Sequence, residues 1–499
     1  MKKWLVFGLF LLSGLLFTAC KPSSSSYVFN YYDYMDTFIQ IQIESVAEKQ
    51  GHKKVYSADE MKQHEDAIGA IFSMYHELST NFEPLKDPNT YLENIFSINQ
   101  KRNQKLEIDR ELYDLIAFAE ELKVLTDGYF DVSIGKTVDI WKSIMTVETE
   151  SIKVDDYVFI FSYRNTSGDV IEKNVFGVVE SISTNSSNQK IYTMRLDDET
   201  IDVMANDHIQ KMNFQRGDRY YVYYVYDGEK KLENKVLINQ AGIVSAVHLN
   251  VDARNQPIVE QVELDLGDRT ITIDKNDVYQ KEITQASYDW ALSQSQALDF
   301  SQNELVLEEE NQKYYITLKG EDAKIDLGAI SKGYATQLVY EYLNDLGFIY
   351  YSISSGTSSI VLGQNTQRPN EGYIYAVGLA NPYRIVVTDP NTYGRVFVKD
   401  TGITTSGNYE QFVLFNGERL HHILSPFTKK PTQYYHTVSL IGRDAGLLDA
   451  LSTALFSMPP EVMENWLELY QEEYGLEVIR FNQDLTIDSF LTTTVFEEN

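Results

Sequence analysis

A glycine-rich turn that carries one lysine is the first feature of this 499-residue chain with a clear chemical use. An apolar run ends at Asp326, and Gly328 and Gly333 then bracket a turn of small residues that contains Lys332. An amphipathic stretch, residues 334–346, follows. A strand, a glycine turn and a helix in this order present backbone N–H groups to a phosphate. A plain strand–turn–helix corner has the same pattern, and the segment does not contain the nucleotide-binding sequence G-x-x-x-x-G-K-[ST].

Asp449 and Thr453 form a second pair that could do chemistry. They are four residues apart in a run of helical composition, so they share one helix face. A carboxylate and a hydroxyl in this arrangement can ligate a hard cation such as Mg²⁺ and leave positions for waters and phosphate oxygens. A buried aspartate bonded to a threonine within the helix would explain the same spacing without a metal.

Three shorter motifs add further groups. His421 and His422 precede Ile-Leu-Ser-Pro, and an imidazole beside a phosphate can donate a hydrogen bond or accept a proton. Residues 126–131, T-D-G-Y-F-D, form an aromatic-bearing turn that could hold a flat ring, and residues 404–409, T-T-S-G-N-Y, form a small-residue turn that permits close backbone approach. Taken singly, each of these motifs also fits an ordinary strand end or surface turn.

The elements that must position these residues divide into three parts. Helical spacing over residues 58–78, 112–126 and 285–297 predicts helices in mixed regions of helix and strand at 28–145 and 284–499. Between them, residues 146–283 consist of short β-rich runs separated by Gly, Asn, Asp and Ser turns. This pattern predicts a barrel- or sandwich-like insertion that splits one domain. No catalytic constellation is found in the inserted part.

The first residues predict export and a lipid anchor. Lys2 and Lys3 precede an apolar run that is too short for a typical membrane-spanning helix, so residues 1–20 are interpreted as a signal peptide. The run ends at Cys20, the only cysteine of the chain, with small residues before it. We therefore expect Cys20 to carry lipid, with the serine-rich residues 21–27 as a tether and the protein on the extracytoplasmic face of the membrane. A structural cysteine within an ordinary signal peptide is the alternative.

The composition excludes some partners. The formal net charge is −30, which argues against nucleic acid and against an electrostatic membrane surface as partners, so the lipid anchor is the only membrane contact expected. A single cysteine allows no intramolecular disulfide.

Together the motifs resemble those of the ApbE family of FAD:protein FMN transferases. The resemblance covers about 28–145 and 284–485, and the motifs follow in the family's order. They are M-D-T at 35–37, L-S-T-N at 78–81, T-D-G-Y-F-D at 126–131, D-L-G-A-I-S-K-G-Y at 326–334, S-G-N-Y at 406–409, H-H-I-L-S-P at 421–426 and D-A-L-S-T at 449–453. The family's fold implies an α+β, T-fold-related catalytic domain, here split by the β-rich insertion.

The resemblance also implies roles. FAD is then the substrate, and Mg²⁺ or Mn²⁺ is held by the backbone carbonyl of Ala329 and the side chains of Asp449 and Thr453. The family's reaction transfers FMN to a Thr or Ser hydroxyl of an extracytoplasmic acceptor protein and releases AMP, with His422 and Asp449 as the catalytic residues. The residues implied to contact FAD are Met35, Asn81, Tyr129, Phe130, Asp131, Asp326, Lys332 and His422.

This chain departs from the family pattern at several positions. Thr428-Lys429 stands in place of the family's T-G after the histidine strand, and the inserted part is not in the usual pattern. Ser425 replaces the usual Asp before the proline, and the glycine pair of the family's N-x-G-G segment is reduced to Gly356. Asn81 stands where some relatives carry an aromatic ring, which predicts weaker FAD binding and faster turnover.

Three other functions remain open on the sequence. Water could replace the acceptor hydroxyl, which would make the protein a metal-dependent FAD pyrophosphatase. A flavin-binding lipoprotein without turnover would not need the Asp449/Thr453 pair. A solute-binding or adhesion lipoprotein would explain the anchor and the β-rich part but not the motifs.

Overall fold

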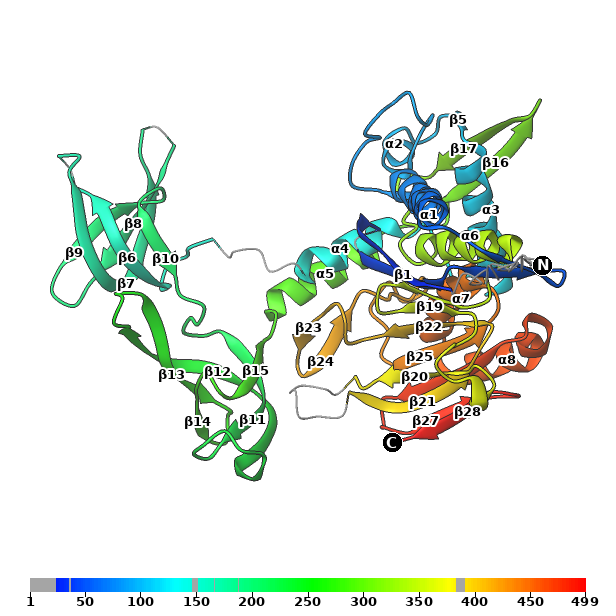
Figure 1. Ribbon diagram of the computed structural model, residues 1–499. Helices are drawn as coiled ribbons and strands as arrows, with labels where there is room; N and C mark the ends of the chain where they lie inside the picture. Colours follow the sequence, from blue (N-terminus) through cyan, green and yellow to red (C-terminus); the bar gives the residue numbers. More distant parts are fainter. Residues whose placement is uncertain (1–23, 36, 146–150, 166, 187, 383–390) are drawn as a thin grey trace, which may run out of the picture.

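The computed structural model describes residues 24–35, 37–145, 151–165, 167–186, 188–382 and 391–499 (Figure 1). Cys20, the predicted signal peptide and Asp36 lie outside these residues, so the lipoprotein prediction stays a prediction. None of the helices in the described part of the chain has both the length and the apolar character to cross a membrane.

An eight-stranded antiparallel sheet is the centre of the main body. Its strands, in spatial order, are β1 (Ser26–Tyr34), β2 (Thr37–Glu44), β18 (Tyr351–Ser355), β19 (Ser359–Leu362), β22 (Thr401–Gly407), β25 (Tyr435–Gly442), β26 (Glu477–Asn482) and β27 (Ile487–Phe490). Strand β25 is buried at every position, as expected for a strand whose two faces are both covered.

One face of the sheet carries a helical layer. It contains α1 (Ala58–Ser79), α2 (Ile95–Gln100), α3 (Arg110–Leu125), α6 (Ser331–Leu346), α7 (Ala445–Ser457) and α8 (Pro460–Tyr474). Helix α7 is buried on nearly all sides and packs against α6, β22 and β25 (Figure 1). Since a helix that is apolar all round belongs in a core, its single carboxylate, Asp449, is an exception that calls for a reason.

Smaller sheets complete the main body. Strands β20 (Tyr375–Ala380), β21 (Thr392–Val398) and β28 (Val495–Glu498) share a second hydrophobic core with the other face of the large sheet. Strands β5 (Leu106–Ile108), β16 (Glu304–Glu310) and β17 (Lys313–Lys319) form a third sheet, and β3 (Val46–Lys49) pairs with β4 (His52–Val55).

The β-rich part contains two open, five-stranded antiparallel sheets (Figure 1, green). The first has the order β10 (His208–Lys211), β6 (Tyr157–Arg164), β7 (Val170–Thr184), β8 (Lys190–Arg195), β9 (Thr200–Met204). The second has the order β14 (Thr270–Ile273), β13 (Pro257–Asp265), β12 (Lys235–Val251), β11 (Arg219–Tyr226), β15 (Val278–Lys281). Each sheet has a hydrophobic cluster of its own, and neither closes into the barrel that the sequence analysis allowed. The boundaries 146 and 283 stay predictions.

Two helices and a hairpin connect the inserted part to the main body. Helix α4 (Gly135–Met145) leads out to the insertion and α5 (Gln285–Ala297) leads back, and the two pack together (Figure 1). The hairpin of β23 (Phe412–Phe415) and β24 (Glu418–His421) lies beside them, and Trp141 shares a small core with its Phe415 and Leu420. Strand β24 therefore runs from the helices that carry the inserted part to His422, the residue directly after the strand.

Candidate active site

All predicted site residues in the described part of the chain line one cavity of about 750 Å³. They come from six separate segments of the sequence, and the cavity lies where α1, α6, α7 and the end of β24 meet. These residues are Met35, Asn81, Tyr129, Phe130, Asp131, Asp326, Ala329, Lys332, His422, Asp449 and Thr453.

Asp449 lies at a point of very close helix packing. A Cβ atom on Gly333 would lie 2.4 Å from both the Ala445 carbonyl oxygen and the Asp449 Cβ, so α6 and α7 can approach this closely only at a glycine. The Gly333 N–H donates a hydrogen bond of 2.9 Å to Asp449 Oδ2. The Ser359 hydroxyl lies 3.5 Å from Oδ1. The orientation of the carboxylate is therefore fixed by its neighbours.

The charge of Asp449 is poorly compensated. Burial raises the pKa of this carboxyl, although the positive charge of Lys332 and the Gly333 hydrogen bond act in the opposite direction. In the part of the chain that the structure describes, no Lys or Arg nitrogen lies within ion-pair distance of it. A buried carboxylate without a paired cation is unfavourable, and a bound divalent cation would remove the penalty.

The neighbouring oxygens suit such a cation. Ala329 and Thr453 line the same cavity as Asp449, and both are partly exposed to it. The described residues contain no group of three His, Cys, Asp or Glu that could hold a metal, so carbonyl and hydroxyl oxygens would have to complete the ligand set. An all-oxygen set of this kind fits Mg²⁺, which keeps several waters and binds phosphate oxygens.

Hydrogen bonds at Asp326 fix the conformation of the glycine turn. The Asp326 N–H donates to the Val132 carbonyl at 2.8 Å, and Asp326 Oδ1 accepts the Gly328 N–H at 2.8 Å. The Lys332 ammonium donates to the Ser358 hydroxyl at 3.1 Å, so it is aimed along the cavity wall. The turn can thus present Lys332 and backbone N–H groups to an anion without rearranging.

The reduced glycine pair is accommodated. Gly356 has φ +73°, and a Cβ there would lie 2.4 Å from the Thr37 hydroxyl, so this glycine is required. Ser355, before it, is fully buried, and its hydroxyl lies 2.7 Å from the Thr336 hydroxyl. Thr357, which stands at the lost glycine, lines the cavity together with Ser358.

The turn after α3 presents one aromatic ring rather than two. The Thr126 hydroxyl accepts the Phe130 N–H at 3.0 Å, and Phe130 packs into the main core. Tyr129 is partly exposed and meets the ring of Phe427 edge-on at 4.7 Å. Asp131 bonds the Ser133 N–H at 2.8 Å and the Lys123 ammonium at 3.0 Å, so its carboxylate holds the turn together.

The two adjacent histidines have different environments. His421 is fully buried 2.6 Å from the Thr432 carbonyl oxygen, and burial lowers its pKa to about 3, so it is a neutral core residue. His422 lines the cavity, with its Nδ1 3.4 Å from the Gln411 carbonyl oxygen. Burial lowers its pKa too, and the charges of Lys142 and Lys332 add to this effect. With Nδ1–H directed at the carbonyl, the Nε2 of neutral His422 is available to accept a proton.

The cavity also contains residues that the sequence motifs did not indicate. The His76 Nδ1 accepts the Met35 N–H at 3.0 Å and so holds the first motif against the end of α1. Phe82 lines the cavity and is 66% exposed, next to the buried Asn81. Lys142 and Glu410 complete this wall. Only Phe82 had a sequence signal, since an aromatic residue follows the position where some relatives carry one.

Comparison with known proteins first gives the class of fold. The crystal structure of the ApbE protein of Thermotoga maritima superposes with a TM-score of 0.50 at 16% identity, covering 93% of this chain and 97% of that one. The chain described here therefore has the fold of the ApbE protein.

The family itself follows from the sequence. The ApbE family model matches residues 35–197 and 269–479, well over half of the chain, and the chain belongs to the ApbE family. The unmatched residues 198–268 all lie within the inserted part.

Individual relatives agree over shorter stretches. A FAD:protein FMN transferase of Rhodobacter capsulatus is 31% identical over 168 residues, which are 33% of this chain and 29% of the relative. One of Escherichia coli K12 is 29% identical over 143 residues, 28% of this chain and 38% of the relative. The matched stretch thus spans well under half of each of these relatives.

Proposed function

We propose that this protein is a FAD:protein FMN transferase, which moves FMN from FAD to a Thr or Ser hydroxyl of an acceptor protein and releases AMP. The observation that carries the proposal is the convergence of Asp449, Thr453 and Ala329 with Lys332 and His422 in one cavity. Matches to relatives that bear this name support it.

Each residue has a physical role in the proposed reaction. Lys332 and the N–H groups of the glycine turn bind the pyrophosphate, and Tyr129 contacts the flat ring. The neutral imidazole of His422 takes the proton from the acceptor hydroxyl as its oxygen attacks the FMN-side phosphorus in line. A new P–O bond forms, the P–O bond to the bridging oxygen breaks, and that oxygen leaves with AMP. Asp449, Thr453 and Ala329 would hold Mg²⁺ or Mn²⁺, which would offset the charge developing on the leaving phosphate.

The proposal includes location and partners. Lipidation at Cys20 would hold the enzyme on the extracytoplasmic face of the membrane, where acceptor proteins with a Thr or Ser target would meet it. The net charge of −30 argues against nucleic acid as a partner.

One assay tests the transferase against hydrolysis and simple binding. The purified protein is incubated with FAD, Mg²⁺ and a candidate acceptor that carries a Thr in a small-residue segment. A mass gain of one FMN on the acceptor is expected. AMP and free FMN without labelling would favour a pyrophosphatase, and bound FAD without either product would exclude both enzymes.

A variant pair then tests the metal site. Asp449→Ala removes the only carboxylate of the three proposed ligands, so Mg²⁺-dependent AMP release should be lost. Asp114→Ala on α3, whose side chain is exposed and outside the cavity, is the control and should leave turnover unchanged. AMP release by Asp449→Ala at the wild-type rate would refute the ligand assignment.

A further inference from the structure

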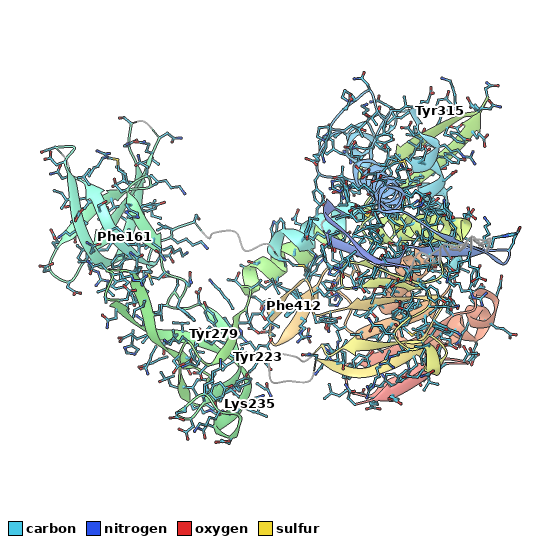
Figure 2. All side chains as sticks on the ribbon, in the orientation of Figure 1. Phe161, Tyr223, Lys235, Tyr279, Tyr315 and Phe412 are labelled. Carbon is cyan, nitrogen blue, oxygen red and sulfur yellow. The ribbon has the colours of Figure 1, made fainter. Side chains whose placement is uncertain are left out.

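The inserted β-rich part contacts the main body through the β23–β24 hairpin. Residues Asn416 and Gly417 form its two-residue turn, and both have positive φ, as the favoured hairpin turns require. A Cβ on Gly417 would lie 2.9 Å from the Tyr221 ring, so the turn lies directly on β11 of the inserted sheet. Tyr223 of β11 and Phe412 of β23 lie at the facing edges of the two parts (Figure 2).

A buried carboxylate fixes this contact. Glu282, at the end of the inserted part, is 3% exposed and accepts the Gly417 N–H at 2.7 Å while it pairs with Arg219 of β11. The Ile283 N–H donates to the Leu414 carbonyl at 2.9 Å, which joins the hairpin backbone to the returning chain. Since these bonds involve backbone and a buried charge, the hairpin and the second inserted sheet form one packed unit.

Tyr223 lies on the same face of β11 as Tyr221, because buried and partly exposed residues alternate along this strand. The two rings meet edge-on at 5.0 Å, and Tyr221 is the ring that contacts Gly417 of the hairpin. Tyr223 is close enough to Arg419 of β24 to feel its charge: burial raises the pKa of the Tyr223 phenol, and the guanidinium of Arg419 lowers it.

Arg419 connects this contact to the wall of the cavity. Its guanidinium donates to Asn408 Oδ1 at 3.3 Å and lies over the Phe412 ring at 4.9 Å. Asn408 is buried, and its N–H donates to the His436 carbonyl at 3.0 Å. The turn that contains Asn408 supplies Gly407, Glu410 and Gln411 to the cavity, and the Gln411 carbonyl lies against His422.

We propose that Arg419 is a positioning residue through which the inserted part holds the 407–411 turn, and with it His422, in the FAD cavity. Tyr223 restrains the guanidinium, the guanidinium restrains Asn408, and Asn408 restrains the turn. The inference deepens the proposed function by giving the insertion a part in nucleotide binding. It depends on that function only where FAD is used as the probe.

The first test uses no FAD. Backbone hydrogen exchange of residues 407–411 is compared in the full-length wild type, Tyr223→Phe, which removes only a hydroxyl, and Tyr226→Phe. Tyr226 is the matched control because it lies on the same strand and packs its ring on Tyr224. Faster exchange in Tyr223→Phe but not in Tyr226→Phe is expected, since losing a restraint raises local opening. Unchanged exchange in Tyr223→Phe would overturn the proposal, whether or not the protein turns over FAD.

The second test is a double-mutant cycle read by FAD affinity. Arg419→Gln should weaken FAD binding by roughly threefold to tenfold, the effect of one hydrogen bond. Tyr223→Phe should weaken it in the same direction, and the double variant should bind no more weakly than Arg419→Gln alone. Arg419→Lys should not rescue binding, because an ammonium cannot bridge two acceptors as the planar guanidinium does. Simple addition of the two effects, or full rescue by lysine, would contradict the relay.

A kinetic split separates positioning from general destabilisation. A displaced turn should raise the KM for FAD and lower kcat together, while thermal unfolding of the inserted sheets stays within a few degrees of wild type. An unchanged KM with reduced folded fraction would make Arg419 a structural residue only. Wild-type protein that binds no FAD would refute the proposed function and leave the exchange result as the test of this inference.

Discussion

Replacement of Gly333 by alanine is the most direct test of how the cavity is built. The added methyl carbon would lie 2.4 Å from the Ala445 carbonyl oxygen and from the Asp449 Cβ, whereas ordinary contacts begin at 3.4 Å. Neither neighbour is the end of a flexible side chain, so α6 and α7 must separate by about 1 Å, a shift that the close packing of interiors resists.

The cost follows from two contributions. Overpacking of a core costs roughly 1–3 kcal/mol, and loss of the hydrogen bond from the Gly333 N–H to the ionised Asp449 adds roughly 1.5–3 kcal/mol, so a loss of about 2.5–6 kcal/mol is expected. Gly446→Ala is the matched control on the facing helix, because its nearest contacts are at 3.3 and 3.4 Å. It should change stability by less than about 1 kcal/mol, since alanine also favours the helix.

Urea unfolding of the two variants and the wild type measures their free energies of unfolding. Titration with FAD in the presence and absence of Mg²⁺ measures metal-dependent FAD binding. Gly333→Ala should lose both stability and metal-dependent FAD binding, because the displaced helix carries Asp449. Stability of Gly333→Ala within 1 kcal/mol of the wild type would show that the helices are not in the contact described here, and the reasoning would fail.

Three further outcomes are expected. Burial alone would raise the pKa of Glu477, but hydrogen bonds from residues 492–494 outweigh it and lower the pKa to about 2. This carboxylate therefore stabilises the fold above its ordinary value of 4.5, and the stabilisation is lost as the pH falls toward 2. Glu477→Gln should lower stability at pH 7 in thermal unfolding, and the difference from wild type should shrink below pH 4. Mg²⁺ should raise the unfolding temperature of the wild type but not of Asp449→Ala, and chelation should reverse the rise. Phe82→Ala should weaken FAD binding by about threefold to tenfold in a flavin-fluorescence titration, since it removes a ring face open to the cavity.

Local sequence patterns predicted the elements well where the periodicity was long. The helices expected at 58–78, 112–126 and 285–297 are observed at Ala58–Ser79, Arg110–Leu125 and Gln285–Ala297. The ordered motifs predicted which residues would meet, because each lies at the end of an element and the family resemblance supplied the distant pairing. Helix α8 and the sheet order were not predicted. Strand β2 pairs with β18 about three hundred residues later, and such pairing leaves no local pattern.

The finer features of the site depend on contacts that no single segment encodes. His421 and His422 are adjacent in sequence, and which one faces the cavity is decided by the register at the end of β24, where a shift of one residue exchanges the two faces. The hydrogen bond between the Gly417 N–H and Glu282 joins residues more than a hundred positions apart. Asp131 lines the cavity as expected, but its carboxylate bonds within its own turn. The ion pair with Lys123, one helix turn before the motif, holds the carboxylate in that orientation.

The packing of α4 against α5 means that the inserted part leaves and re-enters the main body at neighbouring points (Figure 1). A segment with adjoining ends can be exchanged or removed at little entropic cost to the domain that carries it, since loop closure depends only weakly on loop length. The main body can therefore keep its fold with different inserted domains between Met145 and Gln285. In this chain the inserted part also contacts the hairpin. We therefore expect a replacement domain that keeps the ends but lacks Tyr223 to fold and to weaken nucleotide binding.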